Sequence, residues 1–158
     1  MITREAVKDD TEWIIQNMKT FWGSVRMVTR GRVHTITDLP GITAEISGER
    51  VGHLSYRIEG DSVEVVSLIA AVENLGIGSA LLEHVEEFSR KLNLRRIWLV
   101  TTNDNLRAFA FWQKRGYSIR AIYPGAMKHS RALKPEIPEV GESGIPIRDE
   151  IEMEKILH

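Results

Sequence analysis

The 158-residue sequence contains no cysteine. This absence excludes disulfide bonds, cysteine-ligated zinc, iron–sulfur clusters and a thiol nucleophile, and it fits a reducing compartment. No apolar run approaches the roughly 20 residues needed to cross a bilayer, and the first ten residues lack an apolar signal core. We therefore expect a cytoplasmic protein that has no membrane partner.

An excess of charge of either sign is also missing. Lys and Arg together number 21, Asp and Glu number 22, and the formal net charge is -1. This balance gives no general electrostatic reason to expect nucleic acid as a partner. The 5 histidines show no metal-ligand spacing, so no metal site is expected. The length and the 42% hydrophobic content fit one compact domain, which we predict to span residues 1–158.

The hydrophobic patterns predict an α/β fold with a mixed central sheet and about four helices. The first half begins with a strand over residues 2–7 and a helix over residues 11–22 that has Thr11 as its N-cap. A second short helix is expected over residues 24–29. Three strand-like runs then cover residues 42–47, 50–59 and 62–70, and their short turn clusters predict an antiparallel meander.

In the second half, strands and helices alternate. Apolar residues recur at helical spacing from Ile77 to Leu92, and the run "RRIWLVTT" then predicts an interior strand, parallel to the strand before the helix. A helix over residues 105–115 and a strand over residues 116–123 follow. The segment "KPEIPEVGESGIP" holds three of the 5 prolines, and such a long connection is more often functional than idle. The pattern "EIEMEKIL" predicts the last strand.

Two glycines, Gly76 and Gly78, lie between an apolar strand and the amphipathic helix. This order is typical of an anion site, because the free N–H groups of a first helical turn point outward and the helix dipole adds partial positive charge. Leu81 stands where a Rossmann fingerprint needs Gly or Ala, and the Lys-Ser/Thr pair of a Walker loop is absent. By itself the motif is equally compatible with a tight packing turn that binds no ligand.

A second motif lies in "TTNDNLRAFAFWQKRGY", where Asn105, Ala108 and Trp112 fall on one helical face. The order of strand, Gly-x-Gly, helix, strand, Asn-x-x-Ala helix and Gly-aromatic strand resembles the GNAT superfamily of acetyl-CoA-dependent N-acetyltransferases. The resemblance covers nearly the whole chain and is strongest over residues 68–123. The segment after residue 123 also looks like that of a bacterial and archaeal subgroup of undefined substrate.

The resemblance implies a GNAT-like sheet whose parallel strands splay at the coenzyme site, with acetyl-CoA as the acetyl donor. It implies a small-molecule or peptide amine as acceptor, and it is compatible with a homodimer. Glu73 departs from the family pattern, which usually has arginine or glutamine there, and weakened coenzyme binding is expected. The coenzyme contacts that the resemblance implies are Leu68, Ile69, Ala70, Leu75, Gly76, Ile77, Gly78, Ser79, Asn105, Ala108 and Trp112.

Direct transfer in a ternary complex is expected, because cysteine and a Gly-x-Ser-x-Gly elbow are both absent. Glu64 interrupts the apolar run "VEVVSLI" and is the candidate general base, although an exposed strand glutamate would show the same pattern. Trp112 stands where the family usually has a tyrosine that acts as the acid, or it is simply a core aromatic. A non-catalytic acyl-coenzyme sensor is the competing interpretation. The candidates for acceptor binding are His53, Tyr56, Tyr123 and Arg131, the first two being also alternative bases.

Overall fold

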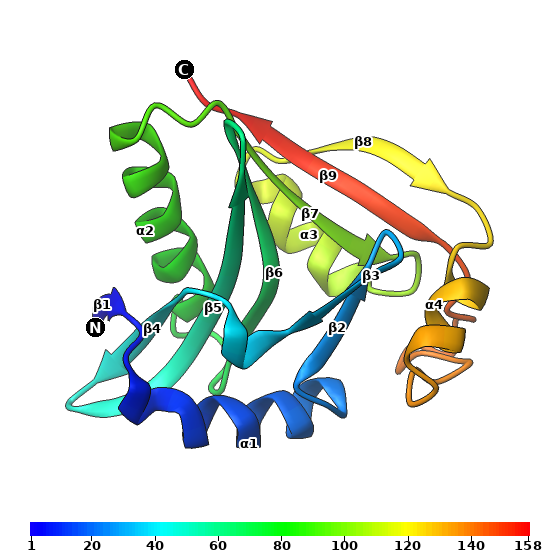
Figure 1. Ribbon diagram of the computed structural model, residues 1–158, viewed down its shortest axis with the longest axis horizontal. Helices are drawn as coiled ribbons and strands as arrows, with labels where there is room; N and C mark the ends of the chain where they lie inside the picture. Colours follow the sequence, from blue (N-terminus) through cyan, green and yellow to red (C-terminus); the bar gives the residue numbers. More distant parts are fainter.

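The computed structural model describes residues Met1–His158 and is built on a 7-stranded sheet with the order β1-β4-β5-β6-β7-β9-β8 (Figure 1). All neighbouring strands are antiparallel except β6 and β7, which are parallel. The last strand of the chain, β9, therefore lies between β7 and β8. The strands are β1 (Ile2–Glu5), β4 (Gly41–Ile46), β5 (Glu49–Glu59), β6 (Ser62–Ala70), β7 (Arg96–Thr102), β8 (Ser118–Tyr123) and β9 (Glu150–Ile156).

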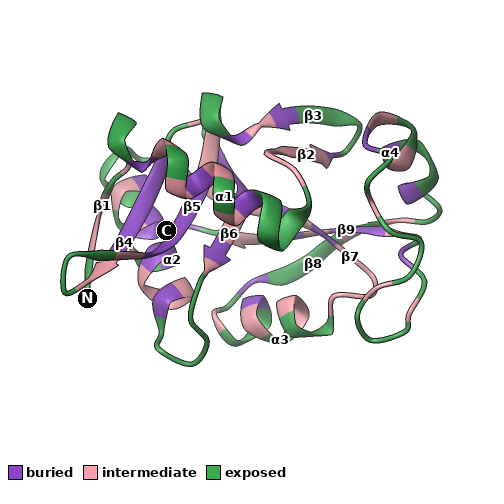
Figure 2. Ribbon diagram, turned by 90° about the horizontal axis from the view of Figure 1, so that it is seen from below, coloured by how far each residue is buried: buried purple, intermediate pink, exposed green.

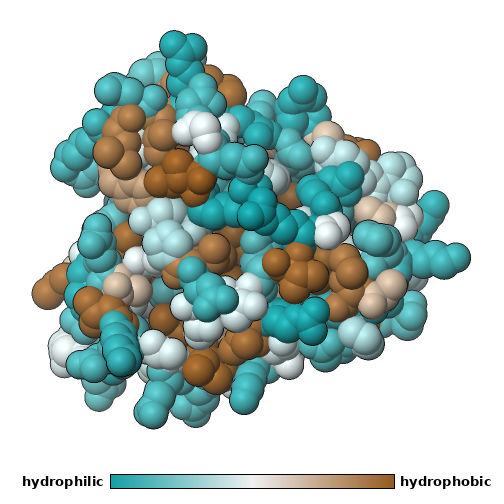
Figure 3. Space-filling view, viewed as in Figure 1, coloured by the Kyte–Doolittle hydropathy of each residue, from teal (hydrophilic) through white to brown (hydrophobic).

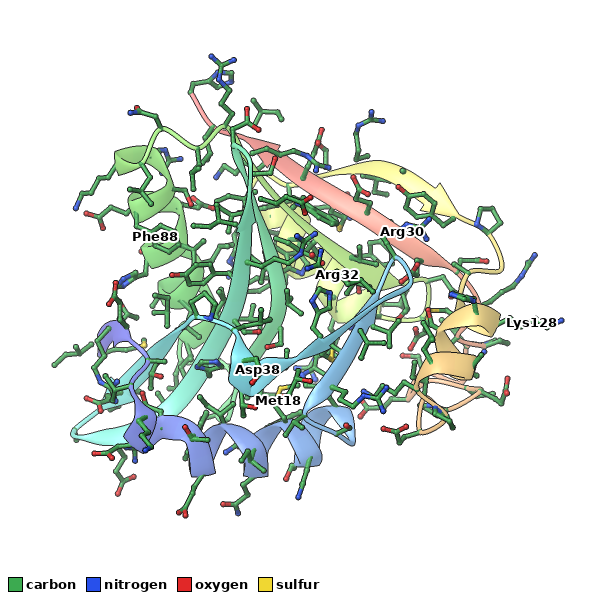
Figure 4. The ribbon with its side chains drawn as sticks, in the orientation of Figure 1. Met18, Arg30, Arg32, Asp38, Phe88 and Lys128 are labelled. Atoms are coloured by element: carbon green, nitrogen blue, oxygen red, sulfur yellow. The ribbon has the colours of Figure 1, made fainter.

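Helices cover both faces of the sheet. Helices α2 (Ile77–Lys91) and α3 (Leu106–Lys114) pack on one face, and α1 (Thr11–Trp22) packs on the other (Figure 2). Each face has its own apolar core, a large one under α2 and α3 and a smaller one under α1. Phe88 of α2 and Met18 of α1 belong to these two cores and point toward the sheet (Figure 4).

A β-hairpin lies on the α1 side, formed by β2 (Arg26–Thr29) and β3 (Arg32–Thr35). The helix predicted over residues 24–29 is therefore wrong. Arg30 and Gly31 have φ values of 50° and 76°. Two successive positive φ values are the requirement of the type I′ turn that fits the twist of a two-residue hairpin. The β-branched residues on either side of this turn then favour strands over a helix.

The other predicted elements are confirmed. The meander over β4, β5 and β6, the parallel pair β6–β7 and the two motif-bearing helices are all present. The chain also contains a short helix, α4 (Met127–Leu133). The N-cap position of α1 is a correction, because Asp10 and not Thr11 precedes the first helical turn. Asp10 is buried and binds the guanidinium groups of Arg4 and Arg50 at 2.8 and 2.6 Å. Two short 3-10 helices complete the fold, Lys8–Asp10 and Ile36–Asp38.

The surface shows no large apolar area on the face drawn in Figure 3. Hydrophobic side chains form small groups there, and hydrophilic side chains separate them. None of the helices has the length and hydropathy needed to span a membrane.

Candidate active site

A cleft opens where the two parallel strands diverge. Strands β6 and β7 pair only from Ser62 to Glu64 of β6, and beyond this point the β7-facing edge of β6 has no strand partner (Figure 1). The cleft measures about 320 Å³ and is mostly apolar. It is lined by Trp22, Met27, Val65, Val66, Ser67, Leu68, Leu99, Val100, Thr101, Asn105, Arg107, Ala108, Phe111 and Trp112.

The first turn of α2 offers free main-chain donors. The N–H of Ala80 donates to the carbonyl of Gly76 at 3.0 Å, whereas the N–H groups of Ile77, Gly78 and Ser79 donate to no other group of the chain. No acidic side chain lies in this turn. Free N–H groups and the positive end of the helix dipole together make a site for an anion.

The two positions of this turn require glycine for different structural reasons. Gly76 has a φ of 72°, a left-handed conformation that side chains disfavour. Gly78 lies against α3, and a Cβ atom there would be only 3.0 Å from the Phe111 ring. The absence of a side chain at Gly78 thus brings α2 and α3 together beside the cleft.

The opposite wall comes from α3. The side chain of Asn105 caps this helix and accepts a hydrogen bond from the N–H of Ala108 at 3.1 Å. Trp112 is buried, and its ring contacts the rings of Phe111 and Tyr117. The structure therefore brings Asn105, Ala108 and Trp112 together at the cleft. Ile69, by contrast, has its side chain in the core under α1, so only its main chain is available.

Arg115 is a candidate that the sequence analysis missed. Its Nε donates to the hydroxyl of Ser79 at 2.9 Å, and its guanidinium lies 3.7 Å from the centre of the Phe111 ring. A positive charge therefore lies beside the free donors of α2. The run "QKRGY" places Arg115 directly after α3, but no local pattern predicts that its side chain contacts Ser79 of α2. Glu73 is paired with Arg107 at 2.7 Å, which offsets its negative charge near the same turn.

Glu64 is buried, so the alternative interpretation of an exposed strand glutamate is wrong. Arg57 Nε donates to one carboxylate oxygen at 2.6 Å, and the hydroxyl of Thr29 donates to the other at 2.8 Å. Burial raises the pKa of Glu64, and the hydrogen bonds from Thr29 and Arg57 partly oppose this rise. Glu64 is the last residue of β6 that pairs with β7, and it does not line the cleft.

His34 extends the hydrogen-bonded group of Glu64, Arg57 and Thr29, and the sequence analysis does not predict its position there. Its Nε2 lies 2.7 Å from the Thr29 hydroxyl, which itself donates to Glu64, so Nε2 carries a proton and donates to Thr29. Burial, with Arg57 and Arg32 nearby, lowers the pKa of His34 to about 4. Only the hairpin fold, with Thr29 in β2 and His34 in β3, brings the two residues together.

His53 and Tyr56 lie away from the lining of the cleft. His53 is buried in β5, neither of its ring nitrogens has a hydrogen-bond partner, and burial lowers its pKa to about 4. Tyr56 packs against Phe88 of α2, with 5.0 Å between the ring centres. The side-chain hydrogen bonds of Glu64 go to Thr29 and Arg57, not to either of these residues.

Tyr123 and Arg131, the other two candidates for acceptor binding, make contacts within the protein. Tyr123 donates its hydroxyl to Glu152 at 2.9 Å, and its ring lies under the guanidinium of Arg30. Arg131 donates to the carbonyl oxygens of Pro138 and Ile147. These contacts fix the connection between β8 and β9. No cluster of three or more His, Cys, Asp or Glu side chains is arranged to hold a metal ion.

Comparison of this chain with known proteins identifies the class to which the fold and the cleft belong. Residues 9–117 match the acetyltransferase (GNAT) family, and the chain belongs to this family. It is 47% identical over 137 residues to the uncharacterized protein YdhI of Bacillus subtilis (strain 168), with 86% of each chain covered.

Two solved structures have the same fold. An acetyltransferase of Bacillus subtilis in complex with CoA is 20% identical, with a TM-score of 0.76 and coverage of 99% of this chain and 98% of that one. A GNAT family acetyltransferase of Elizabethkingia anophelis with acetyl-CoA bound is 18% identical, with a TM-score of 0.69 and coverage of 99% and 97%. At these identities the likeness establishes the fold.

Proposed function

We propose that this chain transfers the acetyl group of acetyl-CoA directly to a primary amine in a ternary complex, with residues 1–158 acting as one N-acetyltransferase domain. The observation that carries the proposal is the set of free N–H groups at Ile77, Gly78 and Ser79. Gly78 lies against Phe111 and Leu68, which line the cleft between the two diverging strands. A diphosphate fits this turn, because its charge meets main-chain donors and the helix dipole without needing a lysine.

The residues of the cleft have separate roles in binding. The first turn of α2 and the Arg115 guanidinium hold the diphosphate, and the free edge of β6 from Leu68 to Ala70 binds the pantetheine amides as an added strand would. Asn105 and Ala108 form the other wall. Leu75, which is 51% exposed, lies in the loop before the turn.

Acetyl-CoA supplies an activated thioester. The amine nitrogen forms the new bond to the acetyl carbon, the carbon–sulfur bond breaks, and the sulfur leaves with the electron pair. Glu64 does not line the cleft, so it takes the proton that the amine loses through an intervening water molecule. The Thr29 hydroxyl, which is bonded to the ring of His34, donates to the Glu64 carboxylate and orients it. The raised pKa of Glu64 brings it closer to that of a useful base at neutral pH.

A non-catalytic acyl-coenzyme sensor is the second candidate. Two observations favour it: the ion pair that holds Glu64, and the indole at position 112, which cannot serve as an acid. A sensor would bind coenzyme through the same turn and cleft, and it would not transfer the acetyl group.

Calorimetry and thiol release separate these functions. The proposal expects calorimetry to detect CoA and acetyl-CoA binding, and it expects at least one member of a primary-amine library to release free thiol from acetyl-CoA. Coenzyme binding without thiol release for any amine would favour the sensor. An absence of any coenzyme binding would reject both functions.

A further inference from the structure

The hairpin side of the cleft presents an apolar wall. Trp22, at the end of α1, and Met27, in β2, are the lining residues from this side, and both are apolar. The helices α2 and α3 pack on the other face of the sheet, so an acceptor that meets the thioester from the α1 side contacts this wall first (Figure 2). No aspartate or glutamate lines any part of the cleft.

The segment between β8 and β9 fixes this wall in place. Lys134 is buried and donates from Nζ to the carbonyl of Trp22 at 2.9 Å, and Arg26 donates to the carbonyl of Leu133 at 2.9 Å. At the hairpin tip, Arg30 binds Glu150 through its main-chain N–H at 3.1 Å and its guanidinium at 2.7 Å (Figure 4). The end of α1 and the hairpin are therefore bound to Leu133, Lys134 and the first residue of β9, Glu150, all more than 100 residues further along the chain.

The charges around the wall are unfavourable for a polycation. Arg26 and Lys134 donate to neutral carbonyl oxygens, so no carboxylate balances them through these bonds. The buried carboxylate Glu64 is already paired with Arg57. Glu150 at the hairpin tip is likewise paired with Arg30. Because no carboxylate lines the cleft, a second ammonium group on an acceptor would find no acidic partner there, and its desolvation would not be repaid.

The size of the cleft further restricts the acceptor. Its volume of about 320 Å³ is near the lower end of the ~300–1,000 Å³ typical of ligand pockets. This space also has to hold the acyl end of the coenzyme. The part of the acceptor that enters the cleft is therefore small.

We propose that the acceptor is a small amine with an apolar, aromatic-sized body and no second positive charge, held between Trp22 and Met27. This inference rests on the proposed acetyltransferase function. An indole gives a flat apolar surface for an aromatic ring, and a methionine side chain adapts to its edge. Trp22 is thus a specificity-determining residue, and Lys134 is a positioning residue because it binds the Trp22 main chain.

A matched pair of amines tests the charge requirement on the full chain. Thiol release from acetyl-CoA is measured with 2-phenylethylamine and with its 4-aminomethyl derivative, which has the same body and a second ammonium group. Spermidine and a tetrapeptide with a free N-terminus complete the panel. We expect kcat/KM for 2-phenylethylamine to exceed that of each other amine by about ten-fold or more. Preference for the diamine, spermidine or the peptide would overturn this inference and leave the acetyltransferase function intact.

Variants test the wall itself. Trp22→Ala is expected to raise KM for 2-phenylethylamine by about ten-fold without changing the Kd of CoA. Met27→Glu places a carboxylate in the wall and should shift the preference toward the diamine. Phe21→Ala is the matched control, because Phe21 is the neighbouring exposed aromatic and does not line the cleft. Equal KM changes for Trp22→Ala and Phe21→Ala would overturn the inference. Coenzyme binding without thiol release for any amine would reject the proposed function itself.

Discussion

The two sides of the cleft are built from different parts of the chain. On the α2 side, the candidate coenzyme site is mostly main chain: N–H groups of one helical turn, two glycines and the free edge of β6. On the hairpin side, the wall depends on side chains from distant segments. Arg30 and Glu150 are 120 residues apart in the sequence, and Arg26 and Leu133 are 107 apart.

The difference explains how one fold can keep a coenzyme and change its acceptor. Main-chain donors at a helix N-terminus are present whatever the side chains are, so few substitutions alter them. A wall held by individual side chains changes with each of them. We therefore expect substitutions on the α2 side to change coenzyme binding. Substitutions on the hairpin side should change acceptor binding and proton transfer instead.

The largest effect is expected for Gly78→Val. A Cβ atom at this position would lie 3.0 Å from the Phe111 ring, so the larger side chain would push the first turn of α2 away from α3 and displace its free N–H groups. We expect a loss of CoA affinity of about 100-fold or more, which corresponds to at least ~2.7 kcal/mol. Calorimetry measures the affinity, and circular dichroism and the melting temperature establish that the variant is folded. A folded variant with wild-type affinity would remove the phosphate-site assignment.

Glu64→Gln tests the hairpin side. At neutral pH we expect turnover to fall about 100-fold, and the loss should shrink at high pH, where more of the amine is already deprotonated. The readout is the pH profile of kcat with a good acceptor.

The control for this variant is Glu59→Gln. Glu59 is the exposed second partner of Arg57, so its removal disturbs the guanidinium and leaves the Glu64 carboxylate in place. Turnover of Glu59→Gln should stay near the wild-type value. If Glu64→Gln retained full turnover at every pH, Glu64 would have no role as the base.

The same division describes what the sequence could and could not predict. The Gly-x-Gly turn before α2 and the helical face of Asn105, Ala108 and Trp112 follow from local spacing, and the contact between Gly78 and Phe111 brings the two motifs together. The sequence does not predict the hairpin, because its turn depends on a non-glycine residue, Arg30, in a positive φ conformation. The partners of Glu64 and the return of Arg115 to α2 depend on tertiary packing, which no short pattern encodes.

The α1 side of the sheet also contains a buried titratable group whose protonation should lower stability. The folded chain does not protonate His53 until about pH 4, whereas the unfolded chain binds this proton below about pH 6.5. The free energy of unfolding should therefore be at its full value above pH 6.5 and fall as the pH drops toward 4. The contribution is about 3 kcal/mol, from roughly 1.4 kcal/mol per pKa unit.

His53→Leu should reduce the slope of unfolding free energy against pH in this window, as measured by urea denaturation at a series of pH values. His129→Leu is the matched control, because His129 is exposed on α4 and its replacement should leave the wild-type slope. A wild-type slope in His53→Leu would show that another group is responsible.

The smallest effect is expected for Trp112→Tyr, which restores the usual phenol at the α3 wall. Trp112 is only 5% exposed, and its ring lies 5.1 and 5.0 Å from the rings of Phe111 and Tyr117. A smaller ring leaves a gap, which should cost about 1 kcal/mol of stability. Coenzyme affinity should be retained, because the free donors of α2 are untouched.

Turnover of Trp112→Tyr should rise by a few-fold and not by the ~10²- to 10⁴-fold that general acid catalysis can give. The coenzyme thiol leaves readily as a thiolate if its pKa resembles the ~8.5 of cysteine, so a proton donor adds little. The neighbouring phenols offer no replacement acid: the Tyr117 hydroxyl is buried and donates to Glu86 at 3.2 Å, and the Tyr123 hydroxyl donates to Glu152. Burial raises the pKa of Tyr117 further, which makes it a weaker acid. Tyr117→Phe and Tyr123→Phe should accordingly change steady-state turnover little, and a large fall in either one, with CoA binding intact, would show that the acid has moved from position 112 to that phenol.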